Sequence, residues 1–176
     1  PKDTAFMLYP LHINDHDFNL EPQENIFKLL EPKAGKYSTI ASRIFTKKVL
    51  TGYAFMALSG AAYGYNQVVL HHYPQFKRVH PEASDRYFNP VESWKNKHKN
   101  GDPNQGAAFW QSKDLLVGFT DFYHLTSQLD HGALVAGTVY ITIGERRKWW
   151  EYAAQLAGGL IVRRAFFGLV YDVIYK

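Results

Sequence analysis

Apolar residues gather along the chain in long blocks, separated by stretches rich in charged residues, proline and asparagine. The first block, residues 49–70, is a run of twenty-two residues without a charge. A helix needs about 20 such residues to cross a bilayer. Two further blocks, 114–144 and 152–175, have helical length but contain some charges. The pattern predicts an all-α fold, a helical bundle embedded in a membrane.

The boundaries of these blocks predict a single domain in five parts. They are an extended N-terminal arm (1–40), a first apolar helix (41–72), a long polar loop (73–113), a second long helix (114–144) and a last helix (145–176). In the arm, only residues 23–30 are expected to form a short helix. The loop contains four prolines that interrupt any long helix, namely Pro74, Pro81, Pro90 and Pro103.

Two glycines in the first block, Gly60 and Gly64, have the GxxxG spacing at which two membrane helices approach closely. We therefore expect them to pack against another helix. A buried core helix of a soluble protein has a similar composition, and the polar centre around Asn66 and Gln67 keeps that alternative open.

Basic residues lie beside the ends of two blocks, at 43–48 before the first and at 146–148 after the second. If both blocks span the membrane, these ends lie on one side. The positive-inside rule makes that side cytoplasmic and places residues 71–113 outside. The mean hydropathy of −0.32 is low for a chain mostly embedded in lipid, so large polar segments must accompany any membrane part.

The second block has one polar face if residues 114–143 form a helix. At about 100° per residue, seven polar side chains fall within roughly 120° of one another. They are Asp114, Asp121, His124, Gln128, His131, Thr138 and Thr142. Asp130 is the exception, because it falls on the apolar side of the helix.

Two interpretations of this polar face remain open. In water it is the solvated side of an amphipathic helix. In a membrane it has to face the bundle interior or a cavity, since an unpaired charge in hydrocarbon costs at least ~2.5 kcal/mol. Candidate partners of Asp121 or Asp130 on the other blocks are Arg163, Arg164, Tyr65 and Asn66. The buried polar network expected in a membrane consists of Asp121, His124, Gln128, His131 and Arg163.

A metal ion is a competing explanation of the same residues. Asp121 and His124 are three residues apart, as carboxylate and histidine ligands are in helical di-iron sites, and Gln128 and His131 repeat that spacing. Histidines near the polar loop would complete such a site, with a divalent metal as cofactor. The candidate ligands are His71, His72, Asp121, His124 and His131, with His80 as a further donor. The HINDHD segment at 12–17 is a second, weaker metal-ligand pattern.

Composition narrows the range of functions. The chain has no cysteine, so disulfides and thiolate metal sites are excluded. The net charge of +4 comes without a clustered basic stripe, and nucleic-acid binding is not expected. The sequence contains no GxSxG, P-loop or GxGxxG motif. Residues 1–18 lack the apolar core of a signal peptide.

Two motifs resemble a family of small uncharacterised proteins from Bacteroidota and their phages. The family pattern is NP-x-x-SW-x-NK-x-K followed by an apolar run ending in TD-x-x-HL. Matching residues here are Asn89, Pro90, Ser93, Trp94, Asn96, Lys97 and Lys99, then Thr120, Asp121, His124 and Leu125. His98 stands where the family pattern has an aromatic residue. The resemblance covers about 88–125 and implies that the polar loop and the Asp-x-x-His turn form one unit, with Trp94 and Lys97 near Asp121 and His124.

Together these patterns predict a helical integral membrane subunit or assembly component of the bacterial inner membrane. Its partners would be membrane lipid and either other protein subunits or further copies of itself. One alternative is a metal-dependent membrane enzyme that uses Asp121, His124 and His131. A second alternative is a soluble helical binding module. Whether the protein is an enzyme stays open on the sequence alone.

Overall fold

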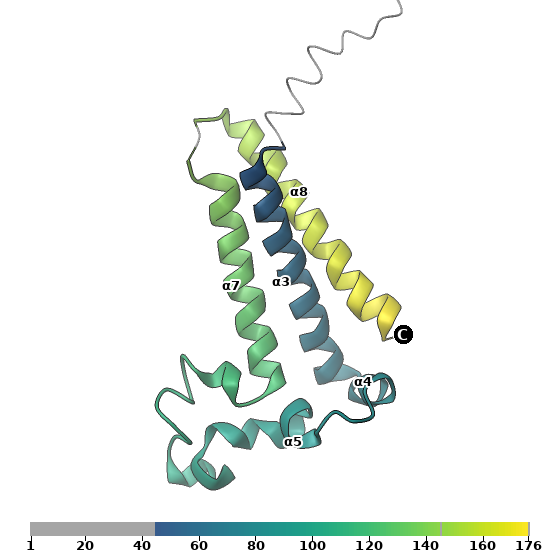
Figure 1. The fold of residues 1–176 in the computed structure, drawn as a ribbon, viewed down its shortest axis with the longest axis vertical. Helices are drawn as coiled ribbons and strands as arrows, with labels where there is room; N and C mark the ends of the chain where they lie inside the picture. The colour runs from purple at the N-terminus through teal and green to yellow at the C-terminus, as the bar shows by residue number, and fades with distance from the viewer. Residues whose placement is uncertain (1–44, 145, 176) are drawn as a thin grey trace, which may run out of the picture. The chain divides into compact units, whose positions relative to one another are not determined.

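The computed structural model describes residues 45–144 and 146–175, and it is all-helical over these ranges (Figure 1). The chain divides into two compact units, Pro1–Thr39 and Ile40–Lys176, and the described residues belong to the second. The predicted all-α class is therefore confirmed for this part of the chain. The predicted arm, its short helix at 23–30 and the HINDHD segment at 12–17 lie outside the described residues.

Three long helices dominate the second unit: α3 (Lys47–His71), α7 (Phe122–Thr142) and α8 (Trp149–Gly168). A π-helical segment, η5 (Leu169–Ile174), continues α8. Helix α3 packs against both α7 and α8, whereas α7 and α8 make few contacts with each other (Figure 1). The helices therefore form a layer with α3 in the middle.

Glycines on two sides of α3 explain why both neighbours come so close. Gly52 lies against Gly137 of α7, where a Cβ atom at position 52 would be 3.0 Å from the Gly137 carbonyl oxygen. Gly60 faces the backbone of Arg163 in α8, and a Cβ atom at Gly64 would be 2.8 Å from Cβ of Val170. The GxxxG pair thus lies in the contact between α3 and the last helix, as small residues allow in closely packed helices.

The polar loop folds into a foot of short helices and turns at one end of the three long helices (Figure 1). The short helices of the loop are α4 (Tyr73–Val79), α5 (Asp85–Phe88), α6 (Pro90–Ser93), η1 (Trp94–Lys97), η2 (Lys99–Gly101) and η3 (Pro103–Gln105), and η4 (Val117–Phe119) follows in the segment before α7. A buried apolar cluster joins this foot to α3 and to the end of α8. It consists of Val68, Val69, Phe76, Val170 and Tyr175.

The predicted start of the second long helix is wrong by about two turns. We predicted a helix from 114, but α7 begins at Phe122 and residues 114–121 lie in turns and the short helix η4. Asp121 is the N-cap, and its side chain accepts a hydrogen bond from the backbone N–H of His124. This cap satisfies a free N–H group at the helix end, so the chain has a local reason to begin the helix there.

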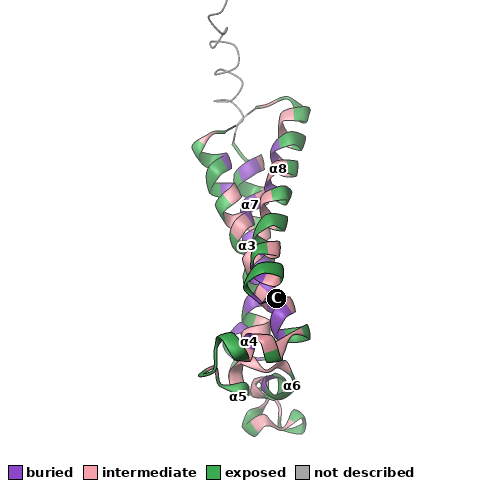
Figure 2. Cartoon of the chain, turned by 90° about the vertical axis from the view of Figure 1, so that its right-hand side faces the viewer, coloured by how far each residue is buried: buried purple, intermediate pink, exposed green. Residues whose placement is uncertain are grey.

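Burial along the three long helices is unusual, because several polar side chains are buried and many large apolar ones are exposed. Buried and exposed residues alternate along each of these helices (Figure 2). Ser59, Asn66, Thr126, Asp130 and Gln155 are all at most 5% exposed. Large apolar side chains such as Val135 and Ile161 are 63% and 69% exposed. Among the described residues, one helix, Trp149–Ile174, is long and apolar enough to cross a membrane by length and composition, and only 17% of its apolar window is buried. A buried core helix of a soluble protein can meet the same two criteria.

Candidate functional site

An ion pair between Asp130 and Arg163 lies at the centre of the three long helices. The Arg163 Nη2 atom donates to Asp130 Oδ1 at 3.0 Å and to Oδ2 at 3.3 Å. Ser59 of α3 completes the group: its hydroxyl donates to Asp130 Oδ1 at 2.5 Å and accepts from Arg163 Nε at 2.9 Å. Each of the three long helices thus contributes one side chain to one hydrogen-bonded triad.

Gly60 and the Tyr63 ring help to position the triad. Gly60 follows Ser59, and the close approach at this glycine brings the α8 backbone onto α3. The Arg163 guanidinium lies 5.1 Å from the centroid of the Tyr63 ring, a cation–π distance. The side chain of Asp130 is 7% exposed and that of Arg163 25%. A buried charge is tolerated only when it is paired and hydrogen-bonded, and this arrangement meets both conditions.

The triad borders a polar groove with a volume of about 410 Å³. Side chains of α3 and α7 line it beside the ion pair, and they include Tyr63, Asn66, Gln67, Tyr123, Ser127 and His131. Asn66 is fixed there, because its Nδ2 donates to the Tyr123 carbonyl oxygen at 2.9 Å. In chemical terms, the groove can offer hydrogen bonds, but its carboxylate and guanidinium are already occupied with each other.

A second polar group, Asp121 with His124 and Thr120, caps the start of α7. Asp121 Oδ1 accepts from the His124 backbone N–H at 2.8 Å, and Asp121 Oδ2 lies 2.7 Å from His124 Nδ1. The Thr120 hydroxyl also donates to Oδ2, at 2.9 Å. Asp121 is 1% exposed, so its carboxylate is buried with its donors.

Removing the Asp121 carboxylate should destabilise the protein moderately. Asp121→Ala leaves the N–H groups at the start of α7 without their cap, and we expect a loss of about 1–2 kcal/mol in the free energy of unfolding. Asp121→Asn keeps an oxygen that can accept from the backbone, so it should lose less. Unfolding followed by circular dichroism measures both, and equal losses for the two variants would contradict the capping role.

The structure does not bring the five residues of the predicted polar network together. Arg163 pairs with Asp130 rather than Asp121, one of the two pairings that the sequence allowed. Gln128 is exposed and bonds the turn before α7, accepting from the Gly118 N–H at 3.1 Å and donating to the Leu115 carbonyl oxygen at 2.9 Å. His131 is exposed and bonds the Ser127 carbonyl oxygen of its own helix at 2.7 Å.

The polar face of α7 therefore does not point into the bundle, as the membrane interpretation required. The face toward α3 instead carries buried Thr126, Asp130, Ala133, Gly137 and Ile141. Asp130, which the helical pattern set apart as an exception, supplies the buried charge. Periodicity identifies residues that share a face, but the choice of inner face is made by the close contact of glycines.

The candidate metal ligands are also apart. No group of three or more His, Asp or Glu residues within the described ranges is close enough to hold a metal ion. His72 bonds the Tyr171 hydroxyl at 2.7 Å, His80 bonds the Tyr175 hydroxyl at 2.6 Å, and His71 is exposed. His72 and His80 thus connect the foot to η5 and to Tyr175, the residue that follows it.

Ser59 is the site residue that the sequence analysis missed. A serine in a run of small residues looks like a helix-packing position, and no motif marks it as a ligand of a carboxylate. The only signal was its place next to Gly60, where helices come close. Gln155 was missed as well: it is fully buried and accepts from Arg147 Nη1 at 2.6 Å.

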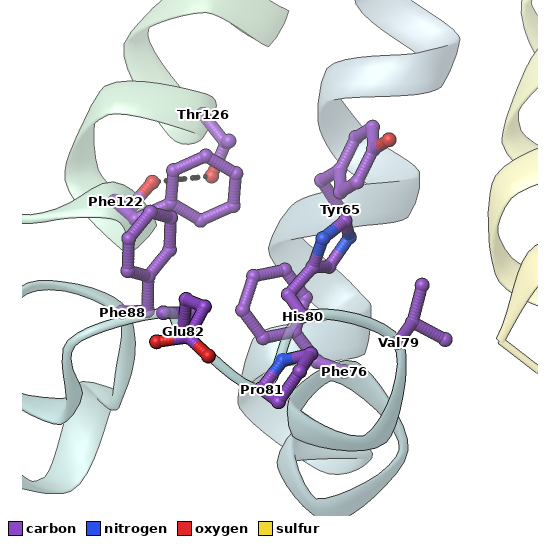
Figure 3. Close-up of a pocket in the computed structure, with 10 residues that line it drawn as sticks. Tyr65, Phe76, Val79, His80, Pro81, Glu82, Phe88, Phe122 and Thr126 are labelled. Atoms are coloured by element: carbon purple, nitrogen blue, oxygen red, sulfur yellow. Dashed lines mark hydrogen bonds between the residues drawn. The ribbon is translucent and has the colours of Figure 1, made fainter.

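The foot contains an aromatic pocket with a volume of about 740 Å³ (Figure 3). Phe88 and Phe122 stand on one side of it and Phe76 and His80 on the other (Figure 3). The Phe88 and Phe122 rings are 4.9 Å apart, and the Phe76 and Phe88 rings are 5.5 Å apart, so the walls support each other. Glu82 and His80 give its rim two polar groups.

The polar loop and the start of α7 are joined by hydrogen bonds into one unit. The Asn96 amide donates to the Thr120 carbonyl oxygen at 3.0 Å and to the Arg86 carbonyl oxygen at 2.6 Å. Trp94 packs edge-on against His98, with ring centroids 5.9 Å apart. The two segments with the resemblance described above, residues 89–99 and 120–125, are thus in contact through the Asn96 side chain.

Searches of the sequence against protein families and curated proteins, and of the structure against solved structures, find no match. What the fold and site define is an all-α protein with a charged pair buried among three helices.

Proposed function

We propose that the chain is a helical integral membrane subunit or assembly component of the bacterial inner membrane. The observation that carries the proposal is the distribution of polarity across the three long helices. Asp130, Arg163 and Ser59 are bonded to one another inside, while many large apolar side chains of these helices are exposed beside a few polar ones such as Gln128 and His131. A protein in lipid has to hide its charges in this way, and large contiguous apolar surfaces mark contact with a membrane or a partner.

The exposed apolar side chains extend along both outer helices. On α7 and the turn after it they include Leu125, Leu129, Val135, Val139 and Ile143, and on α8 and η5 they include Leu160, Ile161, Phe166, Leu169 and Val173. The 21 residues of α7 give it a length of about 31 Å, close to the hydrocarbon thickness of a bilayer. Such a surface fits lipid tails or the helices of partner subunits.

Charge at one end of the helices supports an orientation. The start of α3 carries Lys47 and Lys48, and the turn before α8 carries residues 146–148, all basic. These segments meet, since Arg147 Nη2 donates to Thr46 Oγ1 at 3.3 Å. Trp149 is 80% exposed beside them, as is typical of a membrane interface. The foot also carries basic residues at 77–99, but acidic residues accompany them there. We infer that the end with Lys47, Lys48 and residues 146–148 is cytoplasmic and that the foot lies on the other side.

Absence of native cysteine makes this orientation directly testable with two single-cysteine variants, Lys113→Cys in the foot and Arg146→Cys at the opposite end. Both side chains are exposed. In intact bacterial spheroplasts, a membrane-impermeant maleimide should label Lys113→Cys at once and Arg146→Cys only after permeabilisation. Retention of the protein in membranes after carbonate washing is the accompanying control.

Other labelling patterns decide between the alternatives. Equal protection of both cysteines together with release by carbonate would favour the soluble helical binding module. The reverse labelling pattern would keep the membrane assignment and overturn the orientation. A metal-dependent enzyme has less support, because the residues proposed as ligands lie at separate places in the described part of the chain.

A further inference from the structure

Arg164 is a second arginine at the level of the buried ion pair, and it takes no part in that pair. Its side chain is exposed, and its guanidinium lies 4.9 Å from the centroid of the Phe167 ring on the same helix. No carboxylate in the described part of the chain forms an ion pair with it. Arg163, its neighbour, has a carboxylate and a hydroxyl as partners.

The depth of Arg164 follows from its neighbour, and this step rests on the proposed membrane function. Consecutive helical residues differ by about 1.5 Å along the axis, so Arg164 shares the level of the ion pair near the middle of α7. Trp149 is about 22 Å away along the helix axis, and Tyr171, whose hydroxyl bonds His72 beside the foot, is about 10 Å away. Both distances exceed the length of an arginine side chain, so the guanidinium does not reach the Trp149 end or the foot. A charge at this depth requires a partner.

None of the three long helices that the structure describes offers a free carboxylate at that level. Helix α3 contains no acidic residue, and the only one in α7, Asp130, is bonded to Arg163. In the last helix, Glu151 and Asp172 lie about 20 Å and 12 Å from Arg164 along the axis. A second copy packed in parallel at the same level therefore brings no counter-charge to Arg164. Residues 1–44 contain acidic residues but no apolar run long enough to span a bilayer, so the sequence does not predict a membrane-embedded carboxylate from this segment.

We propose that the Arg164 face of α8 binds a membrane-spanning helix of a different protein, one that carries Asp or Glu near its middle. The surroundings of Arg164 suit such a helix. Ala157, Leu160 and Ile161 are one to two turns away on the same side of α8, and all three are exposed. The small Ala157 allows close approach, and the two larger side chains give an apolar contact around the charge.

The test uses the full-length protein in phosphatidylcholine vesicles and three synthetic leucine–alanine helices of membrane-spanning length. The helices differ at one central residue, which is Glu, Gln or Ala. Association is measured by energy transfer between a dye on the peptide and a dye on a Lys113→Cys variant. We expect the Glu peptide to bind about tenfold more tightly than the Ala peptide, with the Gln peptide in between.

The preference for Glu should depend on Arg164 alone. Arg164→Gln should abolish it, whereas Arg164→Lys should retain most of it. Arg146→Gln, which removes an exposed arginine at the end of the helices, is the matched control and should leave the preference unchanged.

Three results would overturn the proposal. One is equal binding of the Glu and Ala peptides. Another is self-association of the protein that Arg164→Gln abolishes, which would make a second copy the partner. The third is loss of Glu-peptide binding when phosphatidylglycerol is added, which would make a lipid phosphate the partner. Extraction of the wild-type protein by carbonate is a separate result: it defeats the membrane function itself, whereas carbonate-resistant protein without a Glu preference defeats only the proposed partner.

Discussion

Replacing Asp130 by alanine will lower the free energy of unfolding by about 3–5 kcal/mol, the largest effect that we expect from any single substitution in this protein. The change removes the carboxylate but leaves Arg163 among the three helices, with Ser59 as its remaining hydrogen-bond partner. The cost is that of an uncompensated charge in a site of low polarity, which is larger than the value of the pair itself. Unfolding of the purified protein in detergent, followed by circular dichroism, measures the change.

A double variant separates the cost of the unpaired Arg163 charge from the stabilisation that the ion pair itself provides. Asp130→Leu combined with Arg163→Met removes both charges, and we expect it to recover most of the lost stability. Asp114→Ala is the matched control, because Asp114 is exposed and lies outside α7, and its effect should stay within about 0.5 kcal/mol. A double variant as unstable as Asp130→Ala would show that the charge left behind is not the cause.

Replacing Gly60 by valine should be the second most damaging change, with a loss of about 3 kcal/mol. A Cβ atom at this position would collide with the carbonyl oxygen of Arg163, which is backbone and cannot turn aside. Helix α8 would have to move away from α3, and that movement would also pull Arg163 from Ser59 and Asp130. Stability in detergent is again the measurement.

Gly132→Ala provides the comparison for Gly60→Val within the same bundle. Gly132 lies in α7, and a Cβ atom there would meet nothing within 4 Å. Alanine has the higher helix propensity, so this variant should be neutral or up to about 1 kcal/mol more stable. If Gly60→Val were equally harmless, the close contact between α3 and α8 would not exist in the folded protein.

The sequence allowed the three long helices to be predicted, because each apolar block is long and contains few residues that break a helix. It misplaced the start of α7, because Asp121 was taken as one member of a helical face although it caps the helix. The seven-residue polar face misled us about which side of α7 is buried. Helical periodicity treats Asp130 as an exception, and only the positions of Ser59 and Arg163 in space show why a charge is placed there.

The candidate site could be predicted in its chemistry but not in its membership. Arg163 inside an apolar block required an acidic partner, and Asp130 was one of the two that the sequence offered. Choosing between Asp121 and Asp130 depends on how far α8 reaches along α7, which no local pattern encodes. Gln128 and His131 were assigned to the interior, yet their bonds go to nearby backbone within the turn before α7 and within α7 itself.

The order of the three long helices in the chain has a consequence for how the protein is synthesised. Asp130 of α7 lies 33 residues before Arg163 of α8, so translation delivers this carboxylate before the arginine that pairs with it. Until α8 is made, Ser59 is the only member of the triad available to Asp130. The first two long helices are thus an unfinished intermediate, and arrival of the third completes them.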